Sequence, residues 1–236
     1  MAARLTTPES AERFLEQTGL ALRYAATPNL PLQSLRSACG PTESKSALVT
    51  SITLTNHLLA TGIGIEVNVV ADRLTIVHRT LMPALYALVR RGRPTDDLDG
   101  LTMPARAAYA LVRQRREISA GDLRHHLGVR ASPKDDLAYE ALFELQHALL
   151  VARGPFEMPK VGIPYLSHEG YPYHLLHERQ PALVKEARRL SIEQAAVTWL
   201  SAFMRNAPDV TPRKLTSLFR RFLSAEEIAR ALARRG

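Results

Sequence analysis

Residues 118–128, Ile-Ser-Ala-Gly-Asp-Leu-Arg-His-His-Leu-Gly, carry the strongest local signal for a fold. Ser119 is a good helix N-cap, because its hydroxyl can accept a hydrogen bond from a backbone N–H of the first turn. Leu123 and Leu127 are one turn apart and therefore share one face of a short helix. Gly128 permits the left-handed backbone that commonly ends a helix. The stretch predicts a short helix with a sharp exit.

The residues on either side of this stretch add two helices and a hairpin. Helices are predicted over residues 103–115 and 135–148. The later helix has apolar residues at helical spacing, which predicts a buried stripe of Ala138, Ala141, Leu142, Leu145 and Leu149. Residues 149–153 and 161–166 are expected to pair as strands. Three helices followed by a hairpin is the order of a winged helix-turn-helix.

The N-terminal part of the chain predicts helices around another hairpin. Residues 42–61 have a helical pattern, and residues 65–70 and 74–78 are apolar and β-branched on either side of a short turn. A helix is predicted over residues 82–91. The linker at residues 92–97 is rich in Gly, Pro and Asp, which indicates a domain boundary.

The C-terminal part is predicted to be helical. Ser191–Gln194 and Ser224–Glu227 each have the pattern of a capping box, and Thr211 precedes a third helix. The fold class expected for the whole chain is mainly α with short β-hairpins, arranged as tandem winged helix-turn-helix-like modules. The expected domains are an N-terminal winged-helix-like module, a central winged helix-turn-helix and a basic C-terminal helical module, over residues 1–95, 101–170 and 178–236.

The net charge of +8 is concentrated near the C-terminus. Residues 181–236 hold 11 Lys and Arg against 5 Asp and Glu, an asymmetry that favours a polyanionic partner. The single cysteine, Cys39, excludes an internal disulfide framework. The N-terminus lacks the apolar core of a signal peptide, and no apolar run is long enough for a membrane span. We therefore expect a cytoplasmic, nucleoid-associated protein that does not contact the membrane.

The helix after Thr211 is predicted to be amphipathic. Its buried stripe is expected to be Leu215, Leu218, Phe219 and Phe222. The opposite side is polar and basic, and its residues are the first predicted contacts to a phosphate backbone: Arg213, Lys214, Ser217, Arg220 and Arg221. The competing interpretation is a solvated basic face. The predicted interface also takes in four residues of the central module, Arg124, His125, Arg153 and Lys160.

The central module's third helix is a poor candidate for reading DNA. Its outward residues are largely acidic: Asp135, Asp136, Tyr139, Glu140 and Glu144. Carboxylates facing phosphates would be repelled, so we expect no operator reading through this helix.

No motif in the sequence indicates a cofactor, a metal or a nucleophilic catalyst. The chain has no nucleophile elbow, phosphate loop or complete dinucleotide fingerprint. The neighbours His125 and His126 point apart on a helix, and His174-x-x-His177 has no third ligand nearby. Glu66 interrupts an apolar strand and could act as a general base, although a solvent-facing strand residue is the favoured interpretation. We expect no metal and no cofactor.

Several short segments together resemble the winged-helix proteins related to the AlkZ/YcaQ DNA glycosylases, especially their shorter relatives. The segments are residues 14–20, 30–35, 81–88, 139–146 and 191–195. The resemblance covers nearly the whole chain. It implies tandem winged-helix modules around a DNA-binding concavity, and a role in the repair or tolerance of damaged DNA.

The chain departs from the catalytic members of that group at the decisive motif. Those enzymes use glutamine–apolar–glutamine, or glutamine–apolar–aspartate, to position water at the damaged nucleotide. None of the six glutamines has Gln or Asp two residues later: Gln17, Gln33, Gln114, Gln146, Gln180 and Gln194. The leading hypothesis is a non-catalytic protein that binds the phosphate backbone of double-stranded DNA in repair, damage tolerance or regulation, as a homodimer or with a repair-protein partner.

Two other hypotheses stay open. One is a glycosylase acting on alkylated or crosslinked bases with a diverged site, in which Glu66 or Gln33 lies near the water. The other is an adaptor that binds proteins alone. The histidines of the central module further predict tighter DNA binding as the pH falls through about 6.5, if they face DNA: His125, His126, His147, His168, His174 and His177.

Overall fold

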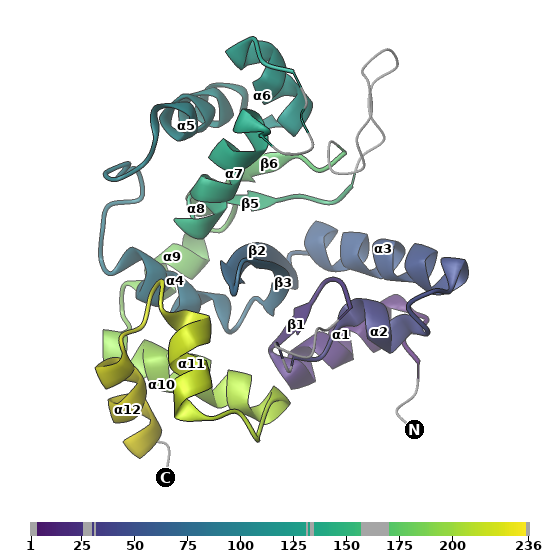
Figure 1. Ribbon diagram of the computed structural model, residues 1–236, viewed down its shortest axis with the longest axis vertical. Helices are drawn as coiled ribbons and strands as arrows, with labels where there is room; N and C mark the ends of the chain where they lie inside the picture. The colour runs from purple at the N-terminus through teal and green to yellow at the C-terminus, as the bar shows by residue number, and fades with distance from the viewer. Residues whose placement is uncertain are drawn as a thin grey trace. The chain divides into compact units, whose positions relative to one another are not determined.

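The computed structural model describes residues 4–25, 30, 32–130, 132, 135–156 and 170–234. It divides into two compact units, Met1–Gly92 with Ala182–Gly236 and Arg93–Pro181 (Figure 1). The C-terminal segment, which was expected to form a module of its own, instead belongs to the same unit as the N-terminal part. Each unit combines helices with short antiparallel strands, so the fold is mixed α/β.

The first unit is built around a three-stranded antiparallel sheet. Its elements are α1 (Pro8–Thr18), β1 (Leu20–Leu22), α2 (Leu35–Cys39), α3 (Lys45–Ala60), β2 (Gly64–Val70), β3 (Arg73–His78), α4 (Met82–Arg90), α9 (Pro181–Ala187, which begins at the boundary between the units), α10 (Ile192–Asn206), α11 (Pro212–Phe219) and α12 (Ala225–Ala233). Within this unit β3 lies between β1 and β2, and Val77 pairs with both Leu20 and Ile65. The predicted hairpin is confirmed by β2 and β3.

The turn between β2 and β3 needs the left-handed backbone twice in succession. Ala71 has φ 50° and Asp72 has φ 56°. Two left-handed residues are what a two-residue type I′ hairpin turn requires, because its twist matches that of the flanking strands. Asp tolerates this conformation better than Ala does, since its short side chain can hydrogen-bond locally.

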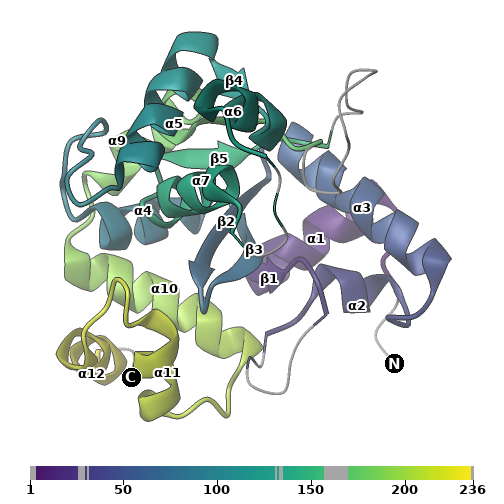
Figure 2. The same ribbon diagram turned by 45° about the horizontal axis from the view of Figure 1, so that its top comes forward.

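Helices α10, α11 and α12 pack together around buried aromatic rings (Figures 1 and 2). The Phe219 ring meets Phe203 edge-on at 4.8 Å between centroids and Trp199 at 5.9 Å. Phe222 joins the same cluster, 5.5 Å from Phe219. The stripe predicted after Thr211 is confirmed, because its four apolar side chains are all buried.

Local signals placed the helix starts correctly. Ser191 and Gln194 form a capping box, and so do Ser224 and Glu227. The helix after Thr211 is shorter than expected, because α11 ends at Phe219. Arg220, Arg221 and Phe222 therefore follow α11 in a turn rather than continuing it.

The second unit contains the three helices and strand pairs around the stretch 118–128. Its elements are α5 (Met103–Arg115), β4 (Glu117–Ile118), α6 (Ala120–Leu127), α7 (Leu137–His147), β5 (Val151–Arg153), β6 (Tyr173–Leu175) and α8 (Leu176–Arg179). Strand β6 pairs with both β4 and β5. The partner expected for β5, at residues 161–166, lies outside the described residues, and β6 was not predicted.

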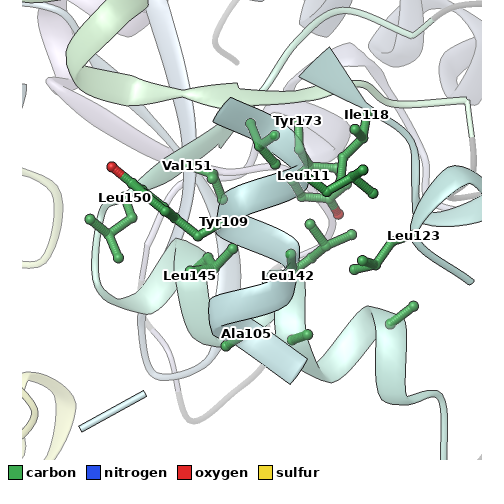
Figure 3. Close-up of a cluster of buried hydrophobic side chains, with 14 of the residues drawn as sticks. Ala105, Tyr109, Leu111, Ile118, Leu123, Leu142, Leu145, Leu150, Val151 and Tyr173 are labelled. Carbon is green, nitrogen blue, oxygen red and sulfur yellow. The ribbon is translucent and has the colours of Figure 1, made fainter. Parts of the chain in front are cut away.

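The core of the second unit lies among α5, α6, α7 and the strands (Figure 3). Tyr109 of α5, Leu142 and Leu145 of α7 and Tyr173 of β6 contribute buried side chains to it. The apolar stripe predicted for α7 is confirmed. In the part of the chain that the structure describes, no helix is both long enough and apolar enough to cross a membrane.

Candidate nucleic-acid interface

The basic side of α11 is exposed while its other side is fixed in the core. Leu215 and Phe219 are fully buried, whereas Arg213 and Ser217 are exposed and Lys214 is half-buried. Thr211 caps the helix by accepting a hydrogen bond from the backbone N–H of Lys214. The buried side holds the helix in place, so its polar side is a fixed platform.

A concave basic surface lies between this platform and the β2–β3 turn, and we call it the hairpin pocket. It has a volume of about 300 Å³ and is lined by Leu30, Ala71, Asp72, Arg73, Lys214, Ser217, Leu218, Arg220 and Arg221. Four cations and one carboxylate line it. The carboxylate belongs to Asp72, whose Oδ1 lies 2.9 Å from Nε of Arg221.

The hairpin pocket brings together most of the C-terminal residues predicted to contact phosphate. Lys214, Ser217, Arg220 and Arg221 all line it, and Arg213 does not. Arg73 was missed by the sequence reasoning. Its signal was available, because a cation within the predicted hairpin turn lies at the exposed tip of the hairpin.

A second concave surface of the first unit, which we call the cleft, is larger and also basic. It has a volume of about 1130 Å³ and is lined by Arg4, Leu5, Ser10, Arg13, Phe14, Gln17, Thr18, Leu32, Gln33, Ser34, Ser37, Ala38, Gly40, Pro41, Thr42, Arg205 and Asn206. Arg4, Arg13 and Arg205 are exposed. Within the described part of the chain, no carboxylate lines the cleft and none pairs with these three arginines.

Partly buried hydrogen bonds hold two walls of the cleft. The side-chain amide of Asn206, at the end of α10, donates to the carbonyl of Thr18 at the end of α1. The buried guanidinium of Arg36 donates to the carbonyls of Pro41 and Ser44, each at 3.0 Å, and to that of Thr42. Because the loop wraps around one planar donor group, its backbone is fixed in the wall.

Among the residues that line the cleft, Gln33 alone was predicted as a candidate site residue. Gln33 is exposed on its wall. The three arginines come from segments far apart in the chain, so no local pattern groups them. Arg13 and Gln17 alone could have been grouped from the local sequence, because residues four apart on a helix share a face.

Two of the four basic residues predicted in the second unit are engaged within the protein. Nε of Arg124 donates to both carboxylate oxygens of Asp136, at 3.1 and 3.2 Å, and both residues are buried. The guanidinium of Arg153 is buried over the Tyr171 ring, 4.2 Å from its centroid. We therefore remove Arg124 and Arg153 from the interface. His125 is exposed, and Lys160 lies outside the described residues.

Two carboxylates of the acidic helix α7 also have structural partners. Asp136 caps α7 by accepting a hydrogen bond from the backbone N–H of Tyr139. Glu144 accepts hydrogen bonds from the backbone N–H and the hydroxyl of Thr102. These contacts join α7 to α6 and to the start of α5.

The expectation that Glu66 faces solvent is wrong. The side chain is fully buried, and its Oε2 lies 2.6 Å from Nη1 of Arg23, which is also buried. Both α3 and α11 contact β2, so alternate residues of this strand do not have one wet and one dry face. A fully buried carboxylate in an ion pair is not presented to a substrate, and Glu66 is no longer a candidate general base.

The histidines of the second unit differ in burial, so they are not expected to titrate together. Burial lowers the pKa of His174 on β6 from 6.5 to about 4, with a smaller contribution from the charge of Arg179. His174 is therefore neutral near pH 6.5 and adds nothing to a pH dependence of binding there. His125 and His126 are exposed, and His168 lies outside the described residues. Among the described residues, no three His, Cys, Asp or Glu side chains are placed to hold a metal ion.

This pKa predicts an acid-sensitive second unit. The unfolded chain takes up a proton near 6.5 and the folded chain only near 4, so stability is lost as the pH falls between these values. The loss should approach about 3 kcal/mol, since each pKa unit corresponds to about 1.4 kcal/mol. Urea unfolding at pH 7 and pH 4.5 should show it. His174→Gln should reduce the dependence and the exposed control His125→Gln should not; equal dependence in both variants would contradict the assignment.

The protein is thus a mixed α/β protein of two units, and the first unit carries two basic concave surfaces, the hairpin pocket and the cleft. The same fold is found in a solved structure, the Streptomyces sahachiroi DNA glycosylase AlkZ, with a TM-score of 0.55 and 10% sequence identity. The match covers 99% of this chain and 60% of AlkZ, so the chain spans about 60% of the length of that protein. The AlkZ-like fold expected from the sequence is thereby confirmed. The sequence matches no protein-family model and no curated protein.

Proposed function

We propose that this chain binds double-stranded DNA through its phosphate backbone, without excising bases, in repair, damage tolerance or regulation. The observation that carries the proposal is the hairpin pocket, where Arg73, Lys214, Arg220 and Arg221 converge beside a rigid helix. Arginine suits this role because its guanidinium can donate two parallel hydrogen bonds to a phosphate.

The cleft supports the proposal as a second phosphate-facing surface. Arg4, Arg13 and Arg205 add three cations to the same unit, and none of them is paired with a described carboxylate. An unpaired exposed cation can neutralise a phosphate without first giving up an ion pair. The likeness to AlkZ adds support by analogy, because that protein is a DNA glycosylase.

We propose that the second unit is a winged helix-turn-helix that does not read base edges. The order α5, β4, α6, α7, β5, β6 and the pairing of β6 with β4 and β5 favour this interpretation. Its α7, at the place of the recognition helix, presents Glu140 and Glu144. Phosphates would repel these carboxylates, so the first unit makes the main contacts.

Base excision is the alternative function, and Gln33 is the observation that favours it. Its exposed amide faces a cleft of about 1130 Å³, which has room for an extruded nucleotide. The chemistry argues against it. Leu35 stands two residues later and is fully buried, and no described residue lining the cleft is a carboxylate that could activate water.

The interface is tested by replacing Arg220 and Arg221 together with alanine. Each lost phosphate contact should make the log–log salt dependence of binding shallower by about 0.9. Affinity should fall by a similar factor for duplexes of different sequence, because phosphates carry no sequence information. Fluorescence anisotropy with a labelled duplex measures both the affinity and its salt dependence. A salt range of about 50 to 200 mM is wide enough to determine the slope.

The control is Arg230→Ala with Arg234→Ala. It removes the same charge from exposed arginines of the first unit that do not line the hairpin pocket or the cleft. We expect a smaller change in slope. Equal slopes for the two double variants would mean that the face of α11 is only solvated.

The absence of excision is tested with the wild-type chain on alkylated and crosslinked duplexes. We expect binding without abasic sites. Base release that is lost in Gln33→Ala would instead establish the glycosylase, while failure to bind any duplex would remove nucleic acid as the partner.

A further inference from the structure

We propose that Asp72 occupies the place of a phosphate in the hairpin pocket and competes with DNA for Arg221, so that it limits the affinity of the interface. This inference rests on the proposed function and adds a regulating residue to that site. Asp72 is the single carboxylate among the described residues that line the pocket, beside four cations.

The geometry of the contact is that of an anion held by a guanidinium. Asp72 Oδ1 lies 2.9 Å from Arg221 Nε, so the carboxylate and the guanidinium form a close ion pair. A phosphate oxygen can pair with the same guanidinium. One arginine nitrogen cannot serve the carboxylate and a phosphate fully at once, so the two anions compete.

Both partners are placed by rigid backbone. The β2–β3 register aligns Val70 with Arg73 across the turn, and this fixes Asp72 at the tip of the hairpin. On the other side, the backbone N–H groups of Phe222 and Leu223 both donate to the carbonyl of Phe219 at 2.9 Å. Exchange of the carboxylate for a phosphate therefore needs only side-chain movement.

The exchange is favoured by the exposure of the pair. The side chains of Arg221 and Asp72 are 49% and 45% exposed, so water and salt screen their attraction. A DNA phosphate carries the same single charge, but it belongs to a polyanion whose bound counterions are released on contact. The polyanion can therefore displace the carboxylate from Arg221. Because the ion pair has to be broken first, the carboxylate makes the free energy of DNA binding less favourable.

The conformation of the turn does not by itself require a charged residue at position 72. Position 72 has φ 56°, a conformation that Asn and Gly adopt readily and Asp tolerates. A neutral residue would therefore serve the turn at least as well as Asp72. The turn accounts for a small polar residue at this position, and the ion pair accounts for its charge.

The test is Asp72→Asn, which preserves the size and the turn and removes the charge. Releasing Arg221 should tighten binding to a 20-base-pair duplex on the order of fivefold at 0.1 M salt and steepen the salt slope by about 0.9, the value of one added phosphate contact. Asp72→Gly, which also suits the turn, should behave in the same way. Thermal melting checks that both variants remain folded.

The matched control is Glu226→Gln. It removes an exposed carboxylate that pairs with Arg230 on α12, so the change in net charge is the same away from the pocket. In an Arg221→Gln background, Asp72→Asn should lose most of its effect. Gains in Asp72→Asn no larger than those in Glu226→Gln would overturn this inference and leave DNA binding intact, whereas no binding by any variant would overturn the proposed function.

Discussion

Replacing Glu66 by alanine is expected to lower the free energy of unfolding by about 3–5 kcal/mol, because it leaves a buried charge uncompensated. The carboxylate lies 2.6 Å from the Arg23 guanidinium, and both side chains are buried. Without Glu66, that guanidinium keeps its charge and loses this neighbour. Chemical denaturation monitored by Trp199 fluorescence measures the loss.

A double replacement separates charge from packing at this site. Glu66→Leu together with Arg23→Met should recover much of the stability, since apolar side chains of similar size often replace a buried ion pair without loss. Wild-type stability in Glu66→Ala, combined with loss of an excision activity, would contradict the structural role and make Glu66 a catalytic candidate again.

Phe219→Ala should cost a similar amount, about 3–5 kcal/mol, and should also weaken DNA binding although it removes no charge. The ring is fully buried and meets Trp199, Phe203 and Phe222. Its loss would open a cavity under α11 and loosen both the platform and the turn that carries Arg221. Denaturation and duplex binding, each measured at 15 °C to keep the variant folded, give the two effects.

The control for this variant is Phe143→Ala in the second unit. Phe143 is half-buried on α7, where its ring contacts His147. We expect a smaller loss of stability and unchanged affinity for DNA. Unchanged affinity in Phe219→Ala as well would mean that the position of α11 does not matter to binding.

Local chemistry explains why much of the secondary structure could be predicted. Ser119, Ser191 and Ser224 cap their own helices, so a few adjacent residues are sufficient to locate each start. Gly128 ends α6 with φ 67°, as expected for a left-handed C-cap. The burial of the stripe on α11 followed from spacing alone.

The features that could not be predicted from the sequence depend on contacts between segments far apart in the chain. Strand β6 has three residues and is stabilised by pairing with β4 and β5, so no periodic pattern reveals it. Glu66 lies on β2, which contacts both α3 and α11, two helices far apart in the sequence. The cleft joins Arg13 to Arg205 across most of the sequence. Of the candidate site, the sequence indicated the basic residues after Thr211, although on a longer helix, and it indicated neither the cleft nor the Asp72–Arg221 ion pair.

The first unit is built from two segments that are separated in the chain, and this affects how it folds during synthesis on the ribosome. Arg93–Pro181 forms a compact unit that is synthesised completely before α10 begins at Ile192. Helix α10 contacts both α1 and α4, so the apolar surfaces of these two helices stay uncovered until Ile192–Asn206 has been synthesised. The inserted unit can fold first, and the unit that contains it closes last. The nascent chain is thus most prone to aggregation before α10 has been synthesised.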